Sequence, residues 1–286
     1  CGSIGEHSFK KDGFDYCLCN KCQTLYVSPR PAEQAFSDYY TNSLSSKFWA
    51  KNFYKETENA RREKIWKPKA KMILNELNKQ GVTDCQIIDI GGGYGVFGEE
   101  MQRICEYPVT IIEPGFHLAK VCEQKGFKVI NDFLQNISSE SLPIGKKCFV
   151  SFELFEHLHS PRIFLKHLND LMDSNDLFMF TTLSGSGLDI QILWEKSPSV
   201  SPPHHLNFFN PKSVKTLLEK TGYECIQVST PGKLDIDILY NNREKIKNRF
   251  WKTFIDVATQ SQKKLWQDIV TSSGFSSHMM IVSKKI

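Results

Sequence analysis

The sequence predicts an α/β protein of the Rossmann-like type, with a seven-stranded, mostly parallel sheet and helices on both faces. Two observations predict it. Apolar, strand-like runs alternate with amphipathic stretches from about residue 86 onward, as in a parallel sheet covered by helices. A glycine-rich turn follows the first of these runs directly. The 286 residues are enough for one such domain with an appendage.

The first 80 residues are expected to form two smaller units. Residues 1–31 lack helical periodicity and end in Ser-Pro-Arg-Pro, which predicts a small ribbon of the zinc-ribbon type followed by a boundary. Residues 32–80 are expected to form a helical lid or linker, with amphipathic stretches at 32–40 and 61–79. The main domain would then occupy residues 81–286.

The main domain is expected to alternate strands and helices along its length. The expected strands are 86–90, 108–112, 127–130, 148–152, 177–182 and 223–229, and the expected helices are 95–105, 116–125, 161–172 and 211–221. The tail should add one helix over about 248–271. A last strand, 279–283, should lie at the edge of the sheet.

Composition and charge narrow the class of protein. The chain is 40% hydrophobic and 24% charged, and no apolar run reaches the roughly 18 residues that a membrane helix needs. No secretory signal is visible, so we expect a cytoplasmic protein with no membrane partner. The net charge is only +4, but residues 42–80 hold ten Lys or Arg against four Glu. A non-catalytic nucleic-acid-binding module is therefore one alternative, although a solvated helix face explains the charges more simply.

The residues from Ile87 to Gly98 form a buried strand, a glycine-rich turn and the start of a helix. Glycine permits positive φ and close approach to a ligand, which a nucleotide site at the end of a parallel strand requires. Gly93, Gly95 and Gly98 satisfy the G-x-G-x-x-G pattern of dinucleotide sites. An NAD-dependent oxidoreductase is therefore a second alternative.

An acid before the first glycine distinguishes between the cofactors. Asp89 precedes Gly91, Gly93 and Gly95 at alternate positions. A carboxylate there would repel a pyrophosphate, whereas S-adenosylmethionine carries an ammonium and a sulfonium that a carboxylate favours. The loop therefore predicts the methyl donor as cofactor.

Two further acids follow at later strand ends. Glu113 ends the second strand and can accept hydrogen bonds from ribose hydroxyls, a feature that both cofactors share. Asp132, after the third strand, offers an acceptor for the adenine amino group, with the ring of Phe133 beside it. Together these residues predict adenosine contacts in chain order.

Further segments resemble the class I S-adenosylmethionine-dependent methyltransferases. Residues 149–161, Phe-Val-Ser-Phe-Glu-Leu-Phe-Glu-His-Leu-His-Ser-Pro, look like the fourth-strand motif of that family. Residues 202–208, 230–237 and 276–279 are similar to segments of a bacterial small-molecule branch associated with surface-sugar and antibiotic-sugar pathways. The loop and the resemblance together give a set of expected cofactor-binding residues: Asp89, Gly91, Gly93, Tyr94, Gly95, Glu113, Pro114, Asp132, Phe133, Glu153, Leu154, His157 and Tyr40.

Methyl transfer from a sulfonium is an in-line displacement, for which the protein mainly aligns the reactants in a dry pocket. If the acceptor loses a proton, a histidine suits the task. His204 and His205 are the candidates, in a proline-bounded loop after the fifth strand. His205 is preferred, because a histidine commonly precedes the Leu-x-Phe-Phe stretch in the resembling families. Either histidine could instead cap the helical region that follows or fill a gap in the packing. Glu156 is expected to organise the cofactor pocket or to be an ordinary helix-start carboxylate.

The N-terminal cysteines predict a structural zinc site. Cys19 and Cys22 form a C-x-x-C knuckle, whose two thiolates can reach one tetrahedral ion. Cys1-Gly-Ser resembles the second half of a Cys-x-x-Cys-Gly-Ser knuckle, which makes Cys1 a third ligand. The fourth would be Cys17 or an upstream cysteine. Free thiols on a hairpin or an emptied site are the alternatives. The five remaining cysteines are expected to be free thiols.

The sequence thus predicts methyl transfer to a small molecule, with a nucleotide-linked sugar of bacterial surface polysaccharide or secondary metabolism as the expected acceptor. O- and C-methylation are both open. Insertions at about 184–210 and 231–257 are expected to shape the acceptor site. We expect no nucleic-acid partner.

Overall fold

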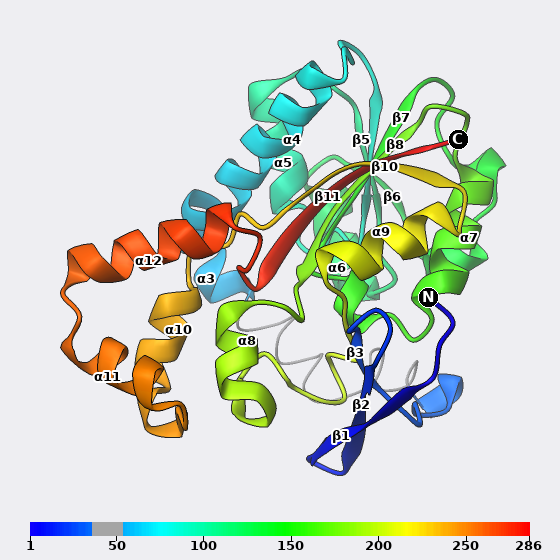
Figure 1. Cartoon of the computed structure of the whole chain (residues 1–286). Coiled ribbons are helices and arrows are strands. Elements are labelled where there is room, and N and C mark those ends of the chain that lie inside the picture. The colour runs from blue at the N-terminus through cyan, green and yellow to red at the C-terminus, as the bar shows by residue number, and fades with distance from the viewer. Residues whose placement is uncertain (36–53) are drawn as a thin grey trace.

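The computed structural model describes residues 1–35 and 54–286. Within these residues the strands form two sheets, one of seven strands and one of four (Figure 1). The seven-stranded sheet has the order β10-β11-β8-β7-β4-β5-β6 and its strands are parallel except for β11. The predicted Rossmann-like fold is therefore confirmed.

The strands of the large sheet coincide closely with the expected ones. They are β4 (Gln86–Ile90), β5 (Val109–Ile112), β6 (Lys128–Ile130), β7 (Lys147–Phe152), β8 (Leu177–Leu183), β10 (Tyr223–Ser229) and β11 (His278–Lys285). Neighbouring side chains in a strand point to opposite faces. Ile87 and Ile111 accordingly pack into one buried cluster, and Ile88 and Ile112 into the other. Both faces of the sheet are thus covered.

Helices provide that cover. They are α4 (Lys67–Lys79), α5 (Val96–Ile104), α6 (Phe116–Gln124), α7 (Pro161–Leu171) and α9 (Pro211–Glu219), whereas α8 (Leu188–Leu193) packs in two smaller clusters away from these faces. Side chains of α4, α5 and α6 pack on one face of the sheet, and those of α7 and α9 on the other. Single helical turns lie at Leu134–Asn136, Ser139–Ser141, Phe155–His157, Trp194–Lys196 and Arg243–Lys245.

The last strand differs from its expected position. β11 lies between β8 and β10, antiparallel to both, and is not at the edge of the sheet. Its residues from Met279 to Ser283 are buried, because neighbouring strands flank it on both sides. The edge prediction was wrong because a short apolar strand at the chain end is equally compatible with an interior position.

The expected single helix over 248–271 is also wrong. The chain forms α11 (Arg249–Val257) and α12 (Gln260–Ser272), preceded by α10 (Asp235–Asn241). A capping box begins α12 and separates it from α11. The Thr259 side chain accepts from the Gln262 backbone N–H, and the Gln262 side chain accepts from the Thr259 backbone N–H. These helices project from the sheet as a separate arm (Figure 1).

The N-terminal ribbon is present. β1 (Gly5–Lys11), β2 (Phe14–Cys19) and β3 (Leu25–Val27) form an antiparallel sheet that β9 (Asn207–Phe208) extends. Its buried Tyr16 packs in one cluster with Phe208 and other residues of the main domain. The ribbon is therefore joined, through the pairing of β3 with β9, to the end of the loop that holds His204 and His205.

The described part of the second unit is helical. α3 (Tyr54–Arg61) continues through a π-helical turn, Arg62–Trp66, into α4. Arg62 pairs with Glu58, Glu99 and Glu100 at 2.6–2.8 Å, which ties this turn to α5. No helix of the described residues is long and apolar enough to span a membrane.

Candidate functional site

The glycine turn connects β4 to α5 at the carboxyl edge of the sheet. Gly91, Gly93 and Gly95 have φ of 74°, 56° and 69°, which L side chains rarely adopt. A Cβ on Gly95 would also lie 3.1 Å from the Cys122 sulfur and 3.2 Å from two further side chains. The loop therefore brings bare backbone to the place where a cofactor would lie.

Two buried carboxyl groups adjoin this loop. Glu113 receives the backbone N–H groups of Gly93 at 2.9 Å and Gly115 at 2.8 Å, and it is 7% exposed. Asp89 is 1% exposed, and its Oδ2 has no hydrogen-bond partner among the described residues. Burial, and next the charge of Glu113, raises the pKa of Asp89 to about 7. Burial also raises the pKa of Glu113.

Such a pair is suited to a ligand that carries positive charge and hydrogen-bond donors. An orphaned buried carboxyl oxygen costs free energy until a donor or a cation reaches it. S-adenosylmethionine offers an ammonium, a sulfonium and two ribose hydroxyls. The residues present at the loop therefore fit this cofactor.

The third expected acid lies on the same edge. Asp132 follows β6, and its Oδ1 accepts from the Phe133 backbone N–H and the Asn136 side chain, each at 2.7 Å. Asn131 donates to the carbonyl oxygens of Glu113 at 2.8 Å and Pro114 at 3.2 Å. These bonds fix the turn after β6 to the end of β5. Of the other expected residues, Tyr40 lies outside the described residues.

Glu153 stands directly after β7 in a strained conformation, with φ of 51°. Its Oε1 lies 2.8 Å from Lys69 Nζ and 2.8 Å from the Thr181 hydroxyl, and its Oε2 lies 3.5 Å from His278 Nε2. Burial alone would raise its pKa, but Lys69 above all, and then His278, hold the pKa of Glu153 below its usual range. The next residue, Leu154, packs 3.6 Å from the position of a Cβ on Gly91.

Sequence reasoning missed Lys69 and His278 as site residues. Lys69 lies on α4, and its Nζ lies 5.4 Å from the centroid of the Trp66 ring and 4.8 Å from that of the Phe152 ring. In sequence it is one of many lysines in a basic stretch. Its periodicity in an amphipathic helix was the only available signal, and that signal does not identify a partner in β7.

A second polar cluster lies beside Glu153. Ligand atoms of Glu156, His157 and His205 lie within 4.8 Å of one another. Glu156 is 2% exposed and accepts the Thr182 hydroxyl at 2.8 Å. Burial, and next the charge of Glu153, raises the pKa of Glu156. The predicted Glu-His pair and His205 are thus brought together.

Backbone carbonyls orient the histidines. His205 Nδ1 lies 2.6 Å from the Ser199 oxygen, and His157 Nδ1 lies 2.9 Å from the His204 oxygen. A carbonyl only accepts, so each Nδ1 carries the proton and each Nε2 presents a lone pair. Burial lowers the pKa of His205 and His204, and it lowers that of His157 to about 3. These imidazoles are therefore neutral at pH 7, the form that can accept a proton.

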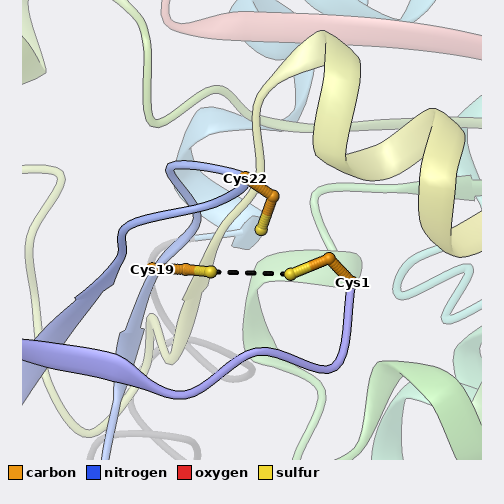
Figure 2. A group of neighbouring side chains, drawn as sticks. All are labelled: Cys1, Cys19 and Cys22. Carbon is orange, nitrogen blue, oxygen red and sulfur yellow. Dashed lines mark hydrogen bonds between the residues drawn. The ribbon is translucent and has the colours of Figure 1, made fainter.

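The three predicted metal-ligating cysteines meet at the base of the ribbon (Figure 2). The sulfurs of Cys1, Cys19 and Cys22 lie within 4.8 Å of one another, and Cys1 Sγ lies 3.5 Å from Cys19 Sγ. Burial tends to raise the pKa of Cys19, but N–H groups of Cys22 and Lys21 lead the opposing effects and the net pKa is lowered. Three converging thiols, one favoured as thiolate, fit a soft cation such as zinc.

The remaining cysteines behave as expected. The exception is Cys17, one of the two candidates for a fourth ligand: it is a half-buried free thiol that does not belong to the group of three. Cys85, Cys122 and Cys148 are buried free thiols, and Cys105 and Cys225 are partly buried free thiols.

The comparison with known families now decides the class. The profile of a family described as a methyltransferase domain matches residues 48–228.

This chain belongs to the methyltransferase-domain family.

The methyltransferase is S-adenosylmethionine-dependent, which confirms the sequence prediction over the oxidoreductase and the non-catalytic alternatives. No curated protein matches its sequence.

Solved structures share its fold. A Thermotoga maritima protein described as an S-adenosylmethionine-dependent methyltransferase and possible histamine N-methyltransferase is 13% identical, with 82% of this chain and 95% of that chain covered and a TM-score of 0.51. A chain of the complex that contains the Haloferax volcanii Trm112 methyltransferase activator is 12% identical, with coverage of 83% and 96% and a TM-score of 0.53. At these identities the similarity concerns the fold alone.

Proposed function

We propose that this methyltransferase modifies a small hydroxylated molecule, namely a nucleotide-linked sugar of bacterial surface polysaccharide or secondary metabolism. The observation that carries the cofactor assignment is the buried pair Asp89 and Glu113 beside the glycine turn. The acceptor assignment is supported by segments 202–208, 230–237 and 276–279, which resemble those of a bacterial small-molecule methyltransferase branch associated with surface-sugar and antibiotic-sugar pathways. The insertions at about 184–210 and 231–257 are proposed to shape the acceptor site.

The proposed cofactor pocket follows the carboxyl ends of β4, β5, β6 and β7. Asp89 would receive the cationic end of the cofactor, Glu113 the ribose, and Asp132 the adenine amino group beside Phe133. The other proposed contacts are Gly91, Gly93, Tyr94, Gly95, Pro114, Glu153, Leu154, His157 and Tyr40. When bound, the cofactor supplies an electrophilic methyl group on sulfur.

The proposed proton acceptor is His205, with His204 as the second candidate. If the acceptor is a hydroxyl or an acidic carbon, its proton passes to His205 Nε2 while the new bond to methyl forms. The Ser199 carbonyl holds the ring and would stabilise the resulting imidazolium through Nδ1. This chemistry serves both O- and C-methylation.

We further propose that Cys1, Cys19 and Cys22 hold a structural zinc ion within a ribbon of residues 1–31. A unit of that size buries too little apolar surface to fold without help, which a metal can supply. The convergence of the three sulfurs supports this assignment. Residues 32–80 are proposed as the lid or linker and 81–286 as the catalytic domain.

Isothermal titration with S-adenosylhomocysteine, alongside NADH as a control, tests the cofactor. We expect S-adenosylhomocysteine to bind with a Kd of about 1 μM to 1 mM, the usual range of enzyme KM values, and NADH not to bind. Transfer of label from [methyl-¹⁴C]-S-adenosylmethionine to nucleoside diphosphate sugars then tests the acceptor. Label appearing only on protein or nucleic acid would refute the small-molecule acceptor.

A further inference from the structure

The interior position of β11 brings a histidine to the active edge of the sheet. Because β11 runs antiparallel to β8, its first residue pairs with the last residue of β8, His278 opposite Leu183. The beginning of β11 thus shares an edge with the carboxyl ends of the parallel strands. The other strands alone would not bring His278 to this edge of the sheet. His278 lies there beside Glu153.

Glu153 is held so that it can fix this ring. Lys69 and Thr181 bind one of its oxygens at 2.8 Å each, which leaves the other to His278 at 3.5 Å. Glu153 has a strained positive φ, which these contacts hold in place. Such strain is concentrated at functional positions. The His278 side chain is 42% exposed, so the ring is reachable from solvent.

A second anchor holds the chain that leads into His278. Asp235 accepts the Ser276 hydroxyl at 2.6 Å, the Ser277 backbone N–H at 2.7 Å and the Ser277 hydroxyl at 3.0 Å. Gln267 of α12 also donates to Asp235 at 2.8 Å. The two segments 230–237 and 276–279 are therefore joined by one buried carboxylate. Asp235 positions the start of β11 from one side, and Glu153 positions the ring from the other.

Lys69, Glu153 and His278 adjoin both the proposed cofactor pocket and the proposed proton acceptor. The charge of Lys69 acts on Asp89 at the glycine turn, and the charge of Glu153 acts on His157 and His205. His278 accordingly stands at the open edge of a site that extends from the cofactor end to the proposed proton acceptor.

We propose that His278 is an acceptor-binding residue that takes a hydrogen bond from a hydroxyl of the methyl acceptor, with Glu153 and Asp235 as its positioning residues. When the neutral ring turns its Nε2 proton toward the Glu153 carboxylate, Nδ1 presents a lone pair, which suits a hydroxyl donor. The chemical class that fits is a polyhydroxylated molecule, in which one hydroxyl binds His278 while another is methylated. This inference rests on the proposed methyl transfer to a small hydroxylated molecule.

The test compares His278→Ala and His278→Asn with the unaltered chain. Nucleoside diphosphate sugars and methyl glycosides serve as probes, assayed for transfer of label from [methyl-¹⁴C]-S-adenosylmethionine. Loss of one hydrogen bond should raise the acceptor KM about tenfold, with kcat within about threefold. His278→Asn should recover part of the loss, because its amide can occupy the place of Nδ1. The acceptor KM of Glu153→Gln should lie between that of the unaltered chain and that of His278→Ala.

His7→Ala is the matched control, since His7 is also an exposed histidine paired with a carboxylate, Asp15, at 3.2 Å, but lies on the ribbon. It should leave KM unchanged. Affinity for S-adenosylhomocysteine should be the same in the His278 and His7 variants as in the unaltered chain. An unchanged acceptor KM in His278→Ala, a tenfold loss of cofactor affinity instead, or a panel in which no hydroxylated probe is methylated would overturn the inference. Failure of the unaltered chain to bind S-adenosylhomocysteine would instead overturn the proposed cofactor pocket.

Discussion

At the scale of single residues, Asp89 shows how burial prepares a carboxyl group for a cationic ligand. With a pKa raised to about 7, it is largely protonated below neutrality in the free protein. A ligand cation favours the carboxylate, so binding at low pH must release a proton. The charge of this one side chain therefore links cofactor affinity to pH.

We predict that affinity for S-adenosylhomocysteine falls about tenfold between pH 8 and pH 6. The sign follows from the raised pKa, since the proton that must leave is more firmly held as the pH falls below 7. Asp89→Asn should bind more weakly at pH 8 and show little of this dependence. Titration calorimetry at several pH values measures both. A constant Kd for the unaltered chain across this range would contradict the role given to Asp89.

His205 is expected to affect the rate and not the affinity for the cofactor. Removing a general base costs on the order of 10²–10⁴-fold in turnover. We predict such a loss of kcat for His205→Ala, with affinity for S-adenosylhomocysteine within about threefold. His204→Ala is the neighbouring control and should lose less. Single-turnover rates with labelled methyl donor make the measurement, and an unaltered rate in His205→Ala would remove this residue from the mechanism.

The acids Asp89, Glu113 and Asp132 were accessible to sequence reasoning because each lies at or just after the carboxyl end of a strand of a parallel sheet, where strand ends converge. Their separation along the chain is therefore irrelevant to their proximity. Lys69 was not accessible, and His278 was singled out only as part of the segment 276–279. Their place beside Glu153 depends on the packing of α4 and on the position of β11 in the sheet, neither of which leaves a local pattern.

At the scale of elements, the turn between β4 and α5 depends on glycine for two separable reasons, conformation and space. Gly95 and Gly81 have nearly the same φ, 69° and 67°. A Cβ on Gly81 would meet nothing within 4 Å, whereas one on Gly95 would press on Cys122, Ile111 and Phe127. The two positions therefore separate strain from crowding.

We predict that Gly81→Ala costs only the left-handed strain, about 1–2 kcal/mol of unfolding free energy. Gly95→Ala should cost about 1–3 kcal/mol more, the usual range for overpacking, and should weaken S-adenosylhomocysteine binding. Denaturant unfolding and titration calorimetry give the two quantities. Equal losses of stability in both variants would show that the space around Gly95 adjusts freely.

Local signals predicted most elements, because strands of a buried sheet and helices with apolar faces leave periodic patterns. The division of 248–271 into α11 and α12 was missed although the Thr259-x-x-Gln262 box was readable, because the apolar positions continue across it. The order of β11 was missed for a different reason. Strand order arises from tertiary pairing, and a buried strand of that composition fits more than one position.

At the scale of the whole molecule, the ribbon and the catalytic domain are mechanically connected. The Tyr16 hydroxyl donates to the His205 carbonyl at 3.0 Å, and Asn210, at the start of α9, donates to the Cys22 carbonyl at 2.8 Å. The cysteine cluster thus supports the loop that carries the proposed proton acceptor.

We predict about one zinc per chain and a lower Tm after chelation, together with slower methyl transfer at unchanged S-adenosylhomocysteine affinity. Cys22→Ser should reproduce the effect. Cys17→Ser is the matched control, because Cys17 lies on the same ribbon outside the cluster. Metal analysis, thermal unfolding and rate measurements check these points. Protein prepared without chelator that contains no zinc would refute the metal assignment.

The place of β11 also bears on how the protein is made. β11 is synthesised after β8 and β10, yet it fills the gap between them in the sheet. Until it arrives, β8 and β10 each have an unpaired edge, which can recruit strands from other nascent chains. Premature termination just before His278 would therefore do more than shorten the protein, because it would leave an aggregation-prone sheet that is split in two.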